Sequence, residues 1–468
     1  MTIRTRFAPS PTGYLHIGSV RTALYCWLFA RHHDGEYLLR IEDTDRNRST
    51  QSAIDAIHEA MAWLGLDSDQ EPIYQTNRSE RYAQRLGELV ERGRAYHCYC
   101  TPEEIDAMRA EAQARGDKPR YDGRCRERSE PREGTSPVVR FKSPLDGKVF
   151  VDDQIKGRIE FDNAELDDLI IARSDGSPTY NFVVVVDDSD MKITHVIRGD
   201  DHLNNTPRQI NLYRAFDQEP PVFAHLPMIH GSDGAKLSKR HGAVNVLEYR
   251  GMGFLPEALL NYLLRLGFAE GDKEIFTLEE MIRAFDLTKV SRSAARFDPQ
   301  KLLWVNHQHV QTAPSGQLVA LLGEHLKNQG LDTGDGPPLE STVEALRERS
   351  QTMLEMAERA HCFYEEYEAF DEKSAKAHLR PVARDALMAL RDALAGLTEW
   401  TEEATEAAVG SVAETLDLKL GKVAQPLRVA LTGRSASPGI GTTLSLVGRE
   451  RALARIDRAL EFIDARAA

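Results

Sequence analysis

The hydrophobic positions near the amino terminus change their period early in the chain. Residues 5–8 predict a short strand, and from residue 17 apolar residues recur at helical spacing at Ile17, Val20, Leu24 and Leu28. Residues 36–41 predict a second strand, and a Ser49 or Thr50 cap then introduces a helix with Ile54, Ile57 and Met61 on one face. Strands that alternate with helices predict a parallel α/β sheet.

This alternation stops between residues 94 and 190, where turn-rich segments separate strand-like runs at 138–141 and 181–186. It resumes with a predicted strand over 194–198, a helix over 207–216 and a strand over 222–229. We therefore expect an insertion that splits the α/β domain into two parts of the sequence.

From about residue 244 onward, nearly every segment has a helical period and good helix formers, and no segment convincingly predicts a strand. A stretch rich in Gly, Asp and Pro at 333–338 indicates a loop between helical subdomains. The carboxyl-terminal half is therefore predicted to be α-helical.

The composition fits a multidomain globular protein. The 468 residues exceed the roughly 250–300 at which a single hydrophobic core stops growing, and 41% hydrophobic with 28% charged residues exclude a disordered chain. No apolar run approaches the about 18 residues that span a bilayer, so we expect a cytoplasmic protein without a membrane partner. The formal net charge of −14 argues mildly against nucleic acid, but basic runs at 115–132 and 236–241 still allow positively charged faces.

The loop between the first predicted strand and helix carries the most specific pattern, Phe7-Ala8-Pro9-Ser10-Pro11-Thr12-Gly13-Tyr14-Leu15-His16-Ile17-Gly18-Ser19. α/β folds bind ligands at this position, and the amino terminus of the next helix offers unpaired N–H groups to phosphate. The two glycines let the backbone approach a ligand, and His16 can donate a hydrogen bond to a phosphate oxygen. A lone His-x-Gly turn is usually incidental, but this longer context favours a phosphate site.

A second loop, residues 231–242, places Lys236 and Lys239 between glycines after the last predicted strand. Such a loop can close over ATP. During attack on the α-phosphate, charge accumulates on the departing pyrophosphate, and a mobile ammonium such as Lys239 stabilises that charge more than it stabilises bound ATP. A short basic loop alone is usually a solvated surface feature. The presence of the His16 loop in the same chain favours the interpretation that this second loop binds phosphate.

Together, His16-Ile17-Gly18-Ser19 and Lys236-Leu237-Ser238-Lys239-Arg240 resemble the two hallmark motifs of class I aminoacyl-tRNA synthetases in order and separation. The segments that resemble the glutamyl-tRNA synthetase family are Arg40-Ile41-Glu42-Asp43-Thr44-Asp45, Pro178-Thr179-Tyr180-Asn181, His195-Val196-Ile197-Arg198-Gly199 and Lys301-Leu302-Leu303-Trp304. The run 421–433 resembles the helical anticodon-binding region of the bacterial branch, whereas glutaminyl enzymes typically carry β-barrels there. The similarity covers essentially the whole chain.

The resemblance implies an α/β Rossmann-type nucleotide-binding domain split by an α+β insertion and followed by an all-α helical stem-contact and anticodon-binding region. The implied domains are the catalytic halves 1–90 and 191–243, the acceptor-stem-binding insertion 91–190, the stem-contact domain 244–322 and the anticodon-binding domain 323–468. The implied reaction activates L-glutamate with ATP and transfers it from glutamyl-adenylate to the 3′-terminal adenosine of tRNA(Glu), in a protein expected to be a monomer. Magnesium accompanies ATP without an assigned protein ligand.

The same resemblance assigns glutamate binding to Arg6, Ala8, Ser10, Glu42, Tyr180 and Arg198. Because a guanidinium binds a carboxylate bidentately, two arginines that converge on one pocket select glutamate over its neutral amide, and Glu42 would pair with the substrate ammonium. ATP binding is assigned to His16, Gly18, Ser19, Lys236, Leu237, Ser238, Lys239 and Arg240, with His16 and Lys239 catalytic. Asp201 is a candidate contact for a ribose hydroxyl, although the family often has glutamate at its neighbour, here Asp200.

Three of the five cysteines fall close enough in the sequence to suggest a zinc site, at Cys98, Cys100 and Cys125. Tetrahedral zinc needs a fourth ligand. Zinc-containing relatives commonly have a histidine two residues after the third cysteine, where this chain has Glu127, whereas Tyr121 matches a tyrosine-ligated site in shorter paralogues. The fourth ligand could therefore be either residue, or the insertion could fold around three reduced cysteines without metal.

For the anticodon, the resemblance points to Arg349 and to Ser437 in a Ser-Pro loop, with Arg347 as the alternative arginine. Three other functions stay open. The first is glutamylation of a modified tRNA base, which is known from shorter paralogues that lack the helical half. The others are tRNA binding without catalysis, which is expected to accompany loss of the motif residues, and adenylyl transfer to a small molecule, which is typical of much shorter chains. The sequence also leaves open whether tRNA(Glu) alone is charged or tRNA(Gln) as well.

Overall fold

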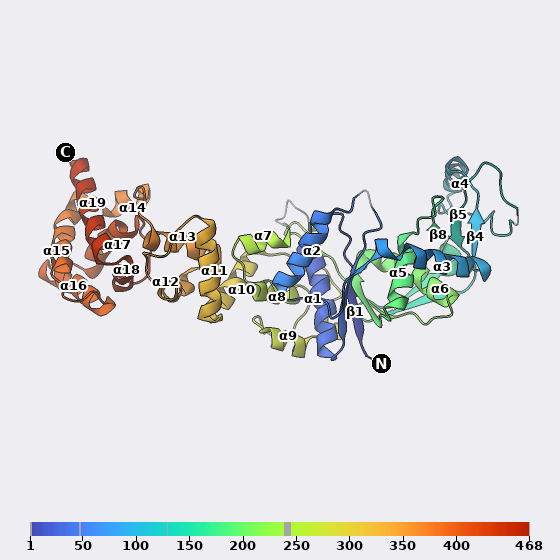
Figure 1. Cartoon of the computed structure of the whole chain (residues 1–468), viewed down its shortest axis with the longest axis horizontal. Helices are drawn as coiled ribbons and strands as arrows, with labels where there is room; N and C mark the ends of the chain where they lie inside the picture. Colours follow the sequence, from blue (N-terminus) through green and yellow to red (C-terminus); the bar gives the residue numbers. More distant parts are fainter. Residues whose placement is uncertain (1, 46–47, 129, 238–244, 468) are drawn as a thin grey trace. The chain divides into compact units, whose positions relative to one another are not determined.

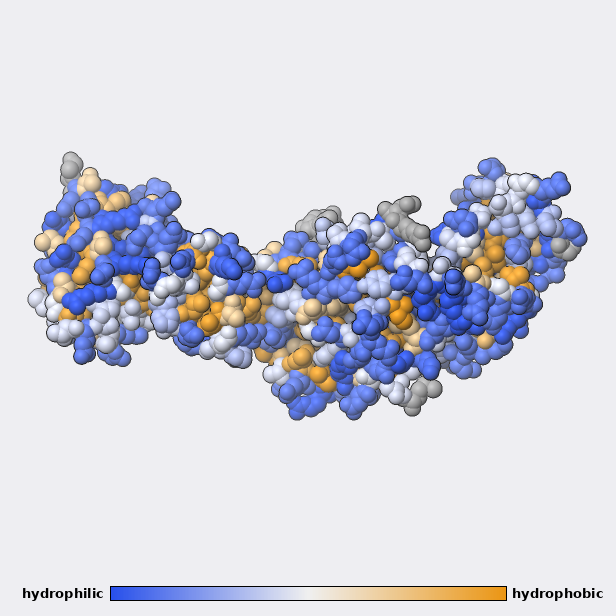
Figure 2. Space-filling model, viewed as in Figure 1, coloured by the Kyte–Doolittle hydropathy of each residue, from blue (hydrophilic) through white to orange (hydrophobic). Residues whose placement is uncertain are grey.

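The computed structural model of the protein describes residues 2–45, 48–128, 130–237 and 245–467. These residues form two compact units, unit 1 with Met1–Glu248 and Leu259–Pro299, and unit 2 with Tyr249–Ala258 and Gln300–Ala468. In the described part of the chain, no helix is long and apolar enough to cross a membrane. The face drawn in Figure 2 is largely hydrophilic, and hydrophobic residues show through it in several separate areas.

The core of unit 1 is a mostly parallel sheet (Figure 1). One run pairs β1 (Arg4–Phe7) with β2 (Glu36–Ile41) and β2 with β3 (Ile73–Tyr74). A second run has the order β9 (His195–Gly199), β10 (Val222–Leu226), β6 (Lys148–Asp153) and β7 (Gly157–Asp162), with β7 antiparallel. The amide of Thr194 donates to the carbonyl of Arg4 at 3.0 Å, so β1 and β9 meet and join the two runs.

Four helices flank these strands at the positions of the α/β pattern: α1 (Ile17–His32), α2 (Gln51–Leu64), α5 (Tyr180–Asp190) and α6 (Thr206–Ala215). The predicted face of α1 is fully buried at Ile17, Val20 and Leu24. Thr50, and not Ser49, is the cap of α2, because its hydroxyl accepts a hydrogen bond from the amide of Ala53 at 3.2 Å.

The inserted region adds a three-stranded antiparallel sheet, β4 (Ala95–Cys98), β5 (Val138–Phe141) and β8 (Ile170–Ala172), together with α4 (Pro102–Ala114), and α3 (Ser79–Glu91), which precedes it in the sequence, contacts β4. Tyr82, Val139 and Phe182 are among the residues of its hydrophobic core. Strands β6 and β7 also come from the inserted sequence, yet β6 pairs with β10 of the nucleotide-binding sheet. The inserted sequence therefore contributes to both sheets.

Two details of the predicted elements are wrong. The strand predicted over 181–186 lies within helix α5, where every residue from Phe182 to Asp188 is buried. A helix buried on all sides has no polar face, so its helical period disappears, and its four consecutive valines favour a strand by propensity. In addition, the strand predicted over 222–229 breaks after Leu226, and β11 (Ile229–His230) pairs with β12 (Ala295–Arg296), a short strand in the region predicted to contain none.

The rest of the chain is helical, as the sequence predicts. The α-helices are α7 (Val246–Gly251), α8 (Pro256–Arg265), α9 (Leu278–Ala284), α10 (Pro299–Thr312), α11 (Ser315–Asn328), α12 (Leu339–Leu346), α13 (Met353–Tyr364), α14 (Glu372–His378), α15 (Arg384–Ala395), α16 (Glu402–Thr415), α17 (Leu420–Thr432), α18 (Ile440–Val447) and α19 (Arg449–Ala467). The short 3₁₀ helices are η1 (Gln75–Arg78), η2 (Asn163–Glu165), η3 (Asp200–Asn205), η5 (Leu287–Lys289), η6 (Arg347–Arg349) and η7 (Pro381–Ala383).

Candidate active site

A cleft of about 2310 Å³ opens in unit 1 where β1, β2, β9 and β10 end. This is where α/β sheets bind ligands. The predicted site residues that line it are Arg6, Ala8, Ser10, His16, Gly18, Ser19, Glu42, Tyr180, Arg198, Asp201, Lys236 and Leu237. The remaining three, Ser238, Lys239 and Arg240, lie outside the described residues.

His16 caps helix α1 in an extended backbone conformation. Its Nδ1 accepts a hydrogen bond from the amide of Ser19 at 3.3 Å, which leaves the proton on Nε2. Desolvation in the cleft and the nearby charge of Lys236 lower the pKa of His16, so the ring is neutral at pH 7. A Cβ at Gly18 would lie 3.1 Å from this ring. The glycine thus leaves room for a neutral imidazole that can donate through Nε2.

The segment that carries Lys236 is a tight hairpin beside the same cleft. The amide of Leu237 donates to the carbonyl of Ile229 at 3.0 Å. The described chain resumes at Asn245, which bridges to His16, and the amide of Val246 donates to the carbonyl of Leu15 at 2.9 Å. Both neighbours of the 238–244 segment are therefore fixed at the cleft.

Arg6 belongs to a buried ion network beneath the cleft. Its Nε and Nη2 donate to the two oxygens of Asp188 at 3.0 and 3.4 Å. Arg40, fully buried on β2, donates to Asp188 at 2.5 Å and to Glu42 at 3.0 Å. Burial raises the pKa of Glu42 and Arg40 opposes that rise, with a net upward direction. Arg6 is therefore oriented by a carboxylate that also compensates its charge.

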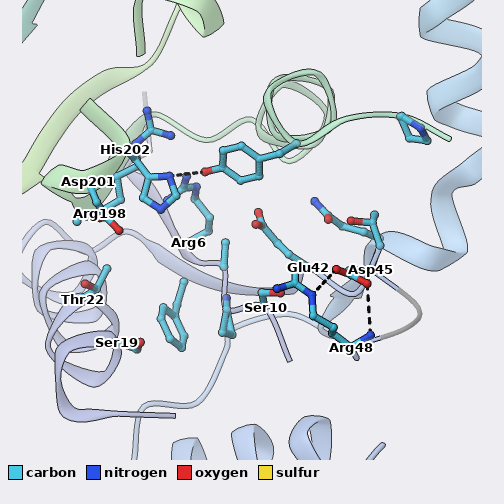
Figure 3. A pocket seen from close by; sticks show the side chains of 18 of the residues that line it. Arg6, Ser10, Ser19, Thr22, Glu42, Asp45, Arg48, Arg198, Asp201 and His202 are labelled. Carbon is cyan, nitrogen blue, oxygen red and sulfur yellow. Dashed lines mark hydrogen bonds and ion pairs between the residues drawn. The ribbon is translucent and has the colours of Figure 1, made fainter. Parts of the chain in front are cut away.

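Arg198 is held differently. It is 5% exposed, its Nε donates to Nε2 of His225 at 3.2 Å, and its Nη2 donates to the hydroxyl of Thr206 at 2.9 Å. Its buried Nη1 has no hydrogen-bond partner among the described residues, and the partners of its other donors, His225 and Thr206, are not carboxylates. Arg6 and Arg198 lie near each other at one end of the pocket (Figure 3). The cleft thus contains a buried guanidinium, that of Arg198, with one N–H donor that has no described partner.

The candidate ribose contact, Asp201, and its neighbour Asp200 have different surroundings in the structure. Asp200 forms an ion pair with Lys156 at 2.8 Å. Asp201 is exposed and lines the cleft, and a Cβ at Gly199 would approach its Oδ1 to 2.5 Å. The structure therefore leaves Asp201, and not Asp200, available to a ligand.

Sequence reasoning missed several residues that shape this site. His202 lines the cleft, and its Nδ1 lies 2.9 Å from the hydroxyl of Tyr180 (Figure 3). The predicted residues are also oriented by side chains that do not line the cleft, namely Asp188, Arg40 and His225. The acidic pair at 187–188 directly after an apolar run was a signal that could have suggested a buried counter-charge, because carboxylates are rarely buried without a partner.

A family model described as "tRNA synthetases class I (E and Q), catalytic domain" matches residues 2–304. The chain belongs to this synthetase family. A second model, "Anticodon binding domain", matches residues 317–460. The expected fold class, a class I catalytic domain followed by a helical anticodon-binding region, is confirmed.

Full-length relatives of this class I synthetase chain have closely similar sequences. Two proteins named "Glutamate--tRNA ligase 1", from Alkalilimnicola ehrlichii and Nitrosococcus oceani, are 57% and 55% identical, each over 100% of this chain and 99% of the relative. A solved glutamate tRNA ligase from Elizabethkingia meningosepticum, in complex with its amino acid, has a TM-score of 0.88 and 34% identity, covering 99% of this chain and 100% of that chain. A glutamate-tRNA synthetase from Elizabethkingia anophelis has a TM-score of 0.85 and 34% identity, covering 98% and 100%.

The cysteine cluster of this synthetase lies in the inserted region. The Sγ atoms that fall within 4.8 Å of one another belong to Cys98, Cys100 and Cys125. The hydroxyl of Tyr121 lies 3.3 Å from the sulfur of Cys98, and Tyr121 is buried. Glu127 instead points to solvent and pairs with Lys142 at 2.8 Å. Of the two candidate fourth ligands, only Tyr121 is placed at the sulfurs.

The two predicted anticodon residues, Arg349 and Ser437, lie in unit 2, near Arg428, an arginine that the sequence did not single out. Arg428 on α17 donates to the carbonyl of Ser437 at 2.8 Å. Desolvation and the nearby charge of Arg349 lower the pKa of Arg428. Arg349 is exposed, whereas Arg347 is directed inward and donates to the carbonyl of Ala313 at 2.6 Å. Arg349 is therefore the arginine available to a partner.

Proposed function

We propose that this protein is a glutamate–tRNA ligase that converts ATP, L-glutamate and tRNA(Glu) into L-glutamyl-tRNA(Glu), AMP and diphosphate. The observation that carries the proposal is the open Nη1 of Arg198, buried beside Arg6 in the catalytic cleft. The names of the full-length relatives support the same reaction. Glutamylation of a modified base is less well supported, because the helical half that shorter paralogues lack matches an anticodon-binding model here.

The charges around the amino-acid pocket favour a substrate with a side-chain carboxylate. Asp188 compensates Arg6, and Glu42 is bound to Arg40. Arg198 is left as a buried cation held only by neutral partners. A buried uncompensated cation is costly, and a substrate carboxylate would supply the missing counter-charge, whereas the amide of glutamine would not. Glu42, Ser10 and Tyr180 are proposed to hold the amino-acid backbone in the same pocket.

For activation, we propose that the α-carboxylate of glutamate attacks the α-phosphorus of ATP, forming one P–O bond as the bond to diphosphate breaks. The amino terminus of α1 and the Nε2–H of His16 would bind phosphate oxygens. Lys236 lines the cleft, and Lys239 follows it by three positions in the sequence; both would stabilise charge on the departing diphosphate. Magnesium would enter bound to ATP. A hydroxyl of the terminal adenosine then attacks the acyl carbon and releases AMP.

We also propose a structural zinc ion in the inserted region. Three thiol sulfurs and the phenol oxygen of Tyr121 give four donor atoms, the number that tetrahedral zinc requires. The guanidinium of Arg140 stacks 3.8 Å from the Tyr121 ring centroid, where its charge would stabilise a metal-bound phenolate. Bound zinc would cross-link β4 to the 121–125 loop. The proposed role is folding of the insertion, and no chemical step depends on it.

Anticodon recognition is proposed to involve Arg349 and the Ser437 loop. Two arginines, Arg349 and Arg428, lie close enough for the charge of Arg349 to lower the pKa of Arg428, and this local positive charge favours an anionic or base-edge partner. The protein is proposed to act as a monomer.

The deciding experiment is aminoacylation with radiolabelled glutamate, ATP and magnesium, run in parallel on purified tRNA(Glu) and tRNA(Gln). Charging of tRNA(Glu) alone would establish a discriminating enzyme, and charging of both tRNAs a non-discriminating one. Charging of neither would reject the proposed function and favour silent tRNA binding or modification of a tRNA base.

A further inference from the structure

Behind the cleft, a buried carboxylate at the end of β6 collects several donors. Asp153 is 4% exposed, and its Oδ1 accepts hydrogen bonds from the amides of Ile155 and Lys156 at 3.0 and 2.7 Å. Its Oδ2 lies 2.6 Å from Nδ1 of His225 on the adjacent strand β10. Main-chain donors stabilise the ionised form of a carboxylate, so Asp153 is an acceptor at every contact.

This acceptor fixes the tautomer of His225. Because the ionised Asp153 can only accept, Nδ1 of His225 carries a proton and donates it. The other ring nitrogen, Nε2, faces Nε of Arg198 at 3.2 Å, and a guanidinium nitrogen can only donate. Because Nε2 accepts from Arg198 it carries a lone pair and no proton, so the fully buried His225 is neutral. The hydroxyl of Thr206 lies 3.1 Å from the same Nε2.

The two arginines of the pocket are thus held along the same guanidinium edge by groups of different charge. At Arg6, the Nε and Nη2 edge meets the carboxylate of Asp188. At Arg198, the corresponding edge meets a neutral imidazole and the Thr206 hydroxyl. A neutral acceptor orients a guanidinium without compensating its charge. The positive charge of Arg198 consequently stays available at Nη1, which has no described partner.

We propose that His225 is a positioning residue that determines specificity: held by Asp153, it orients Arg198 toward the substrate carboxylate and leaves its charge uncompensated, which favours glutamate over glutamine. The proposal rests on the proposed ligase function. His225 does not line the cleft, so its effect on substrate passes through Arg198. Phe223, whose ring lies 5.5 Å from the Arg198 guanidinium carbon, supports the same orientation through its π face.

The test compares His225→Phe, which keeps an aromatic ring but removes both hydrogen bonds, with His225→Gln, whose amide oxygen can restore the acceptor near the position of Nε2. His195→Phe is the matched control, because His195 lies on the neighbouring strand β9, is partly buried and does not line the cleft. Each purified full-length variant is assayed for tRNA(Glu) charging, with KM for glutamate, KM for ATP, kcat and the ratio of kcat/KM for glutamate to that for glutamine.

His225→Phe is expected to raise KM for glutamate by at least about tenfold and to lower the glutamate-to-glutamine ratio by a similar factor, with kcat changed less than about threefold and KM for ATP unchanged. His225→Gln should recover much of the affinity, and His195→Phe should match the wild type. A parallel change in both KM values and kcat, or an unchanged glutamate-to-glutamine ratio, would overturn the positioning role.

Thermal melting of each variant identifies loss of folding. If His225→Phe does not fold, His225→Asn carries the test, because its amide can still donate to Asp153 but does not reach Arg198; it should show the same loss of glutamate affinity, and wild-type affinity would overturn the proposal. A wild-type enzyme that charges no glutamate would reject the ligase function itself, whereas an active wild type with insensitive His225 variants rejects only this inference.

Discussion

Replacement of Arg198 by alanine is the most direct perturbation of the proposed glutamate pocket. Arg198 is 5% exposed, and of the two arginines assigned to glutamate, Arg6 and Arg198, it is the one with a buried donor, Nη1, that has no partner in the described part of the chain. Arg198→Ala removes that cation and leaves a bound glutamate carboxylate partly desolvated beside Arg6 alone. Because Asp188 already compensates Arg6, the remaining arginine cannot replace the lost charge.

The expected magnitude follows from the loss of a charged hydrogen-bond partner in a desolvated site. Such truncations cost roughly 2–4 kcal/mol. At about 1.4 kcal/mol per factor of ten, kcat/KM for glutamate should fall roughly 30- to 700-fold. The proposed ATP contacts lie on α1 and the 231–237 hairpin, so KM for ATP should stay within about twofold of the wild type.

The assay is charging of tRNA(Glu) over a range of glutamate concentrations at saturating ATP and tRNA. Arg214→Ala provides the matched control, because Arg214 is an exposed arginine of the same unit, on helix α6, and does not line the cleft. Thermal melting of both variants separates a loss of binding from a loss of folding. A folded Arg198→Ala enzyme with wild-type kcat/KM for glutamate would refute the pocket assignment.

Three further predictions concern the rest of the molecule. Asp188→Asn should lower the free energy of unfolding by roughly 3–5 kcal/mol at pH 7, because it leaves buried Arg6 without a carboxylate partner and takes one of its carboxylates from Arg40, which keeps Glu42. Burial raises the pKa of Asp188 and the two arginines lower it, with a net fall. The wild type therefore has the stabilisation from ionised Asp188 above about pH 4 and loses it in more acidic solution. If denaturant unfolding showed the same acid dependence for the wild type and Asp188→Asn, the ion network would be contradicted. Tyr121→Phe should reduce bound zinc per chain, measured by atomic emission, well below the level of Glu127→Ala, and equal metal content in both would exclude the phenol as a ligand. Arg349→Ala should raise KM for tRNA(Glu) by roughly fivefold or more while KM for glutamate stays constant, and an unchanged KM for tRNA would remove Arg349 from the anticodon site.

The local pattern of the sequence was enough to predict the elements that carry the nucleotide site. The strand, loop and helix around His16, and the strand that ends at Arg198, depend on side-chain period and turn residues within a few positions of one another. Most of the predicted cleft residues follow from two short motifs whose resemblance to a family could be read without any knowledge of packing. The position of these residues at one cleft could be predicted because the information it needs is contiguous in the chain.

Only the tertiary structure decided which side chains form hydrogen bonds and ion pairs with those residues. Arg6 and Asp188 are separated by 182 positions, and His225 meets Asp153 across 72, so no local pattern relates them. Packing also made a helix of the valine-rich segment predicted as a strand, and placed Tyr121 rather than Glu127 at the cysteines. Sequence period reports which side of an element is buried, whereas the partner of a buried charge depends on which distant elements pack together, and that is fixed only when the whole fold forms.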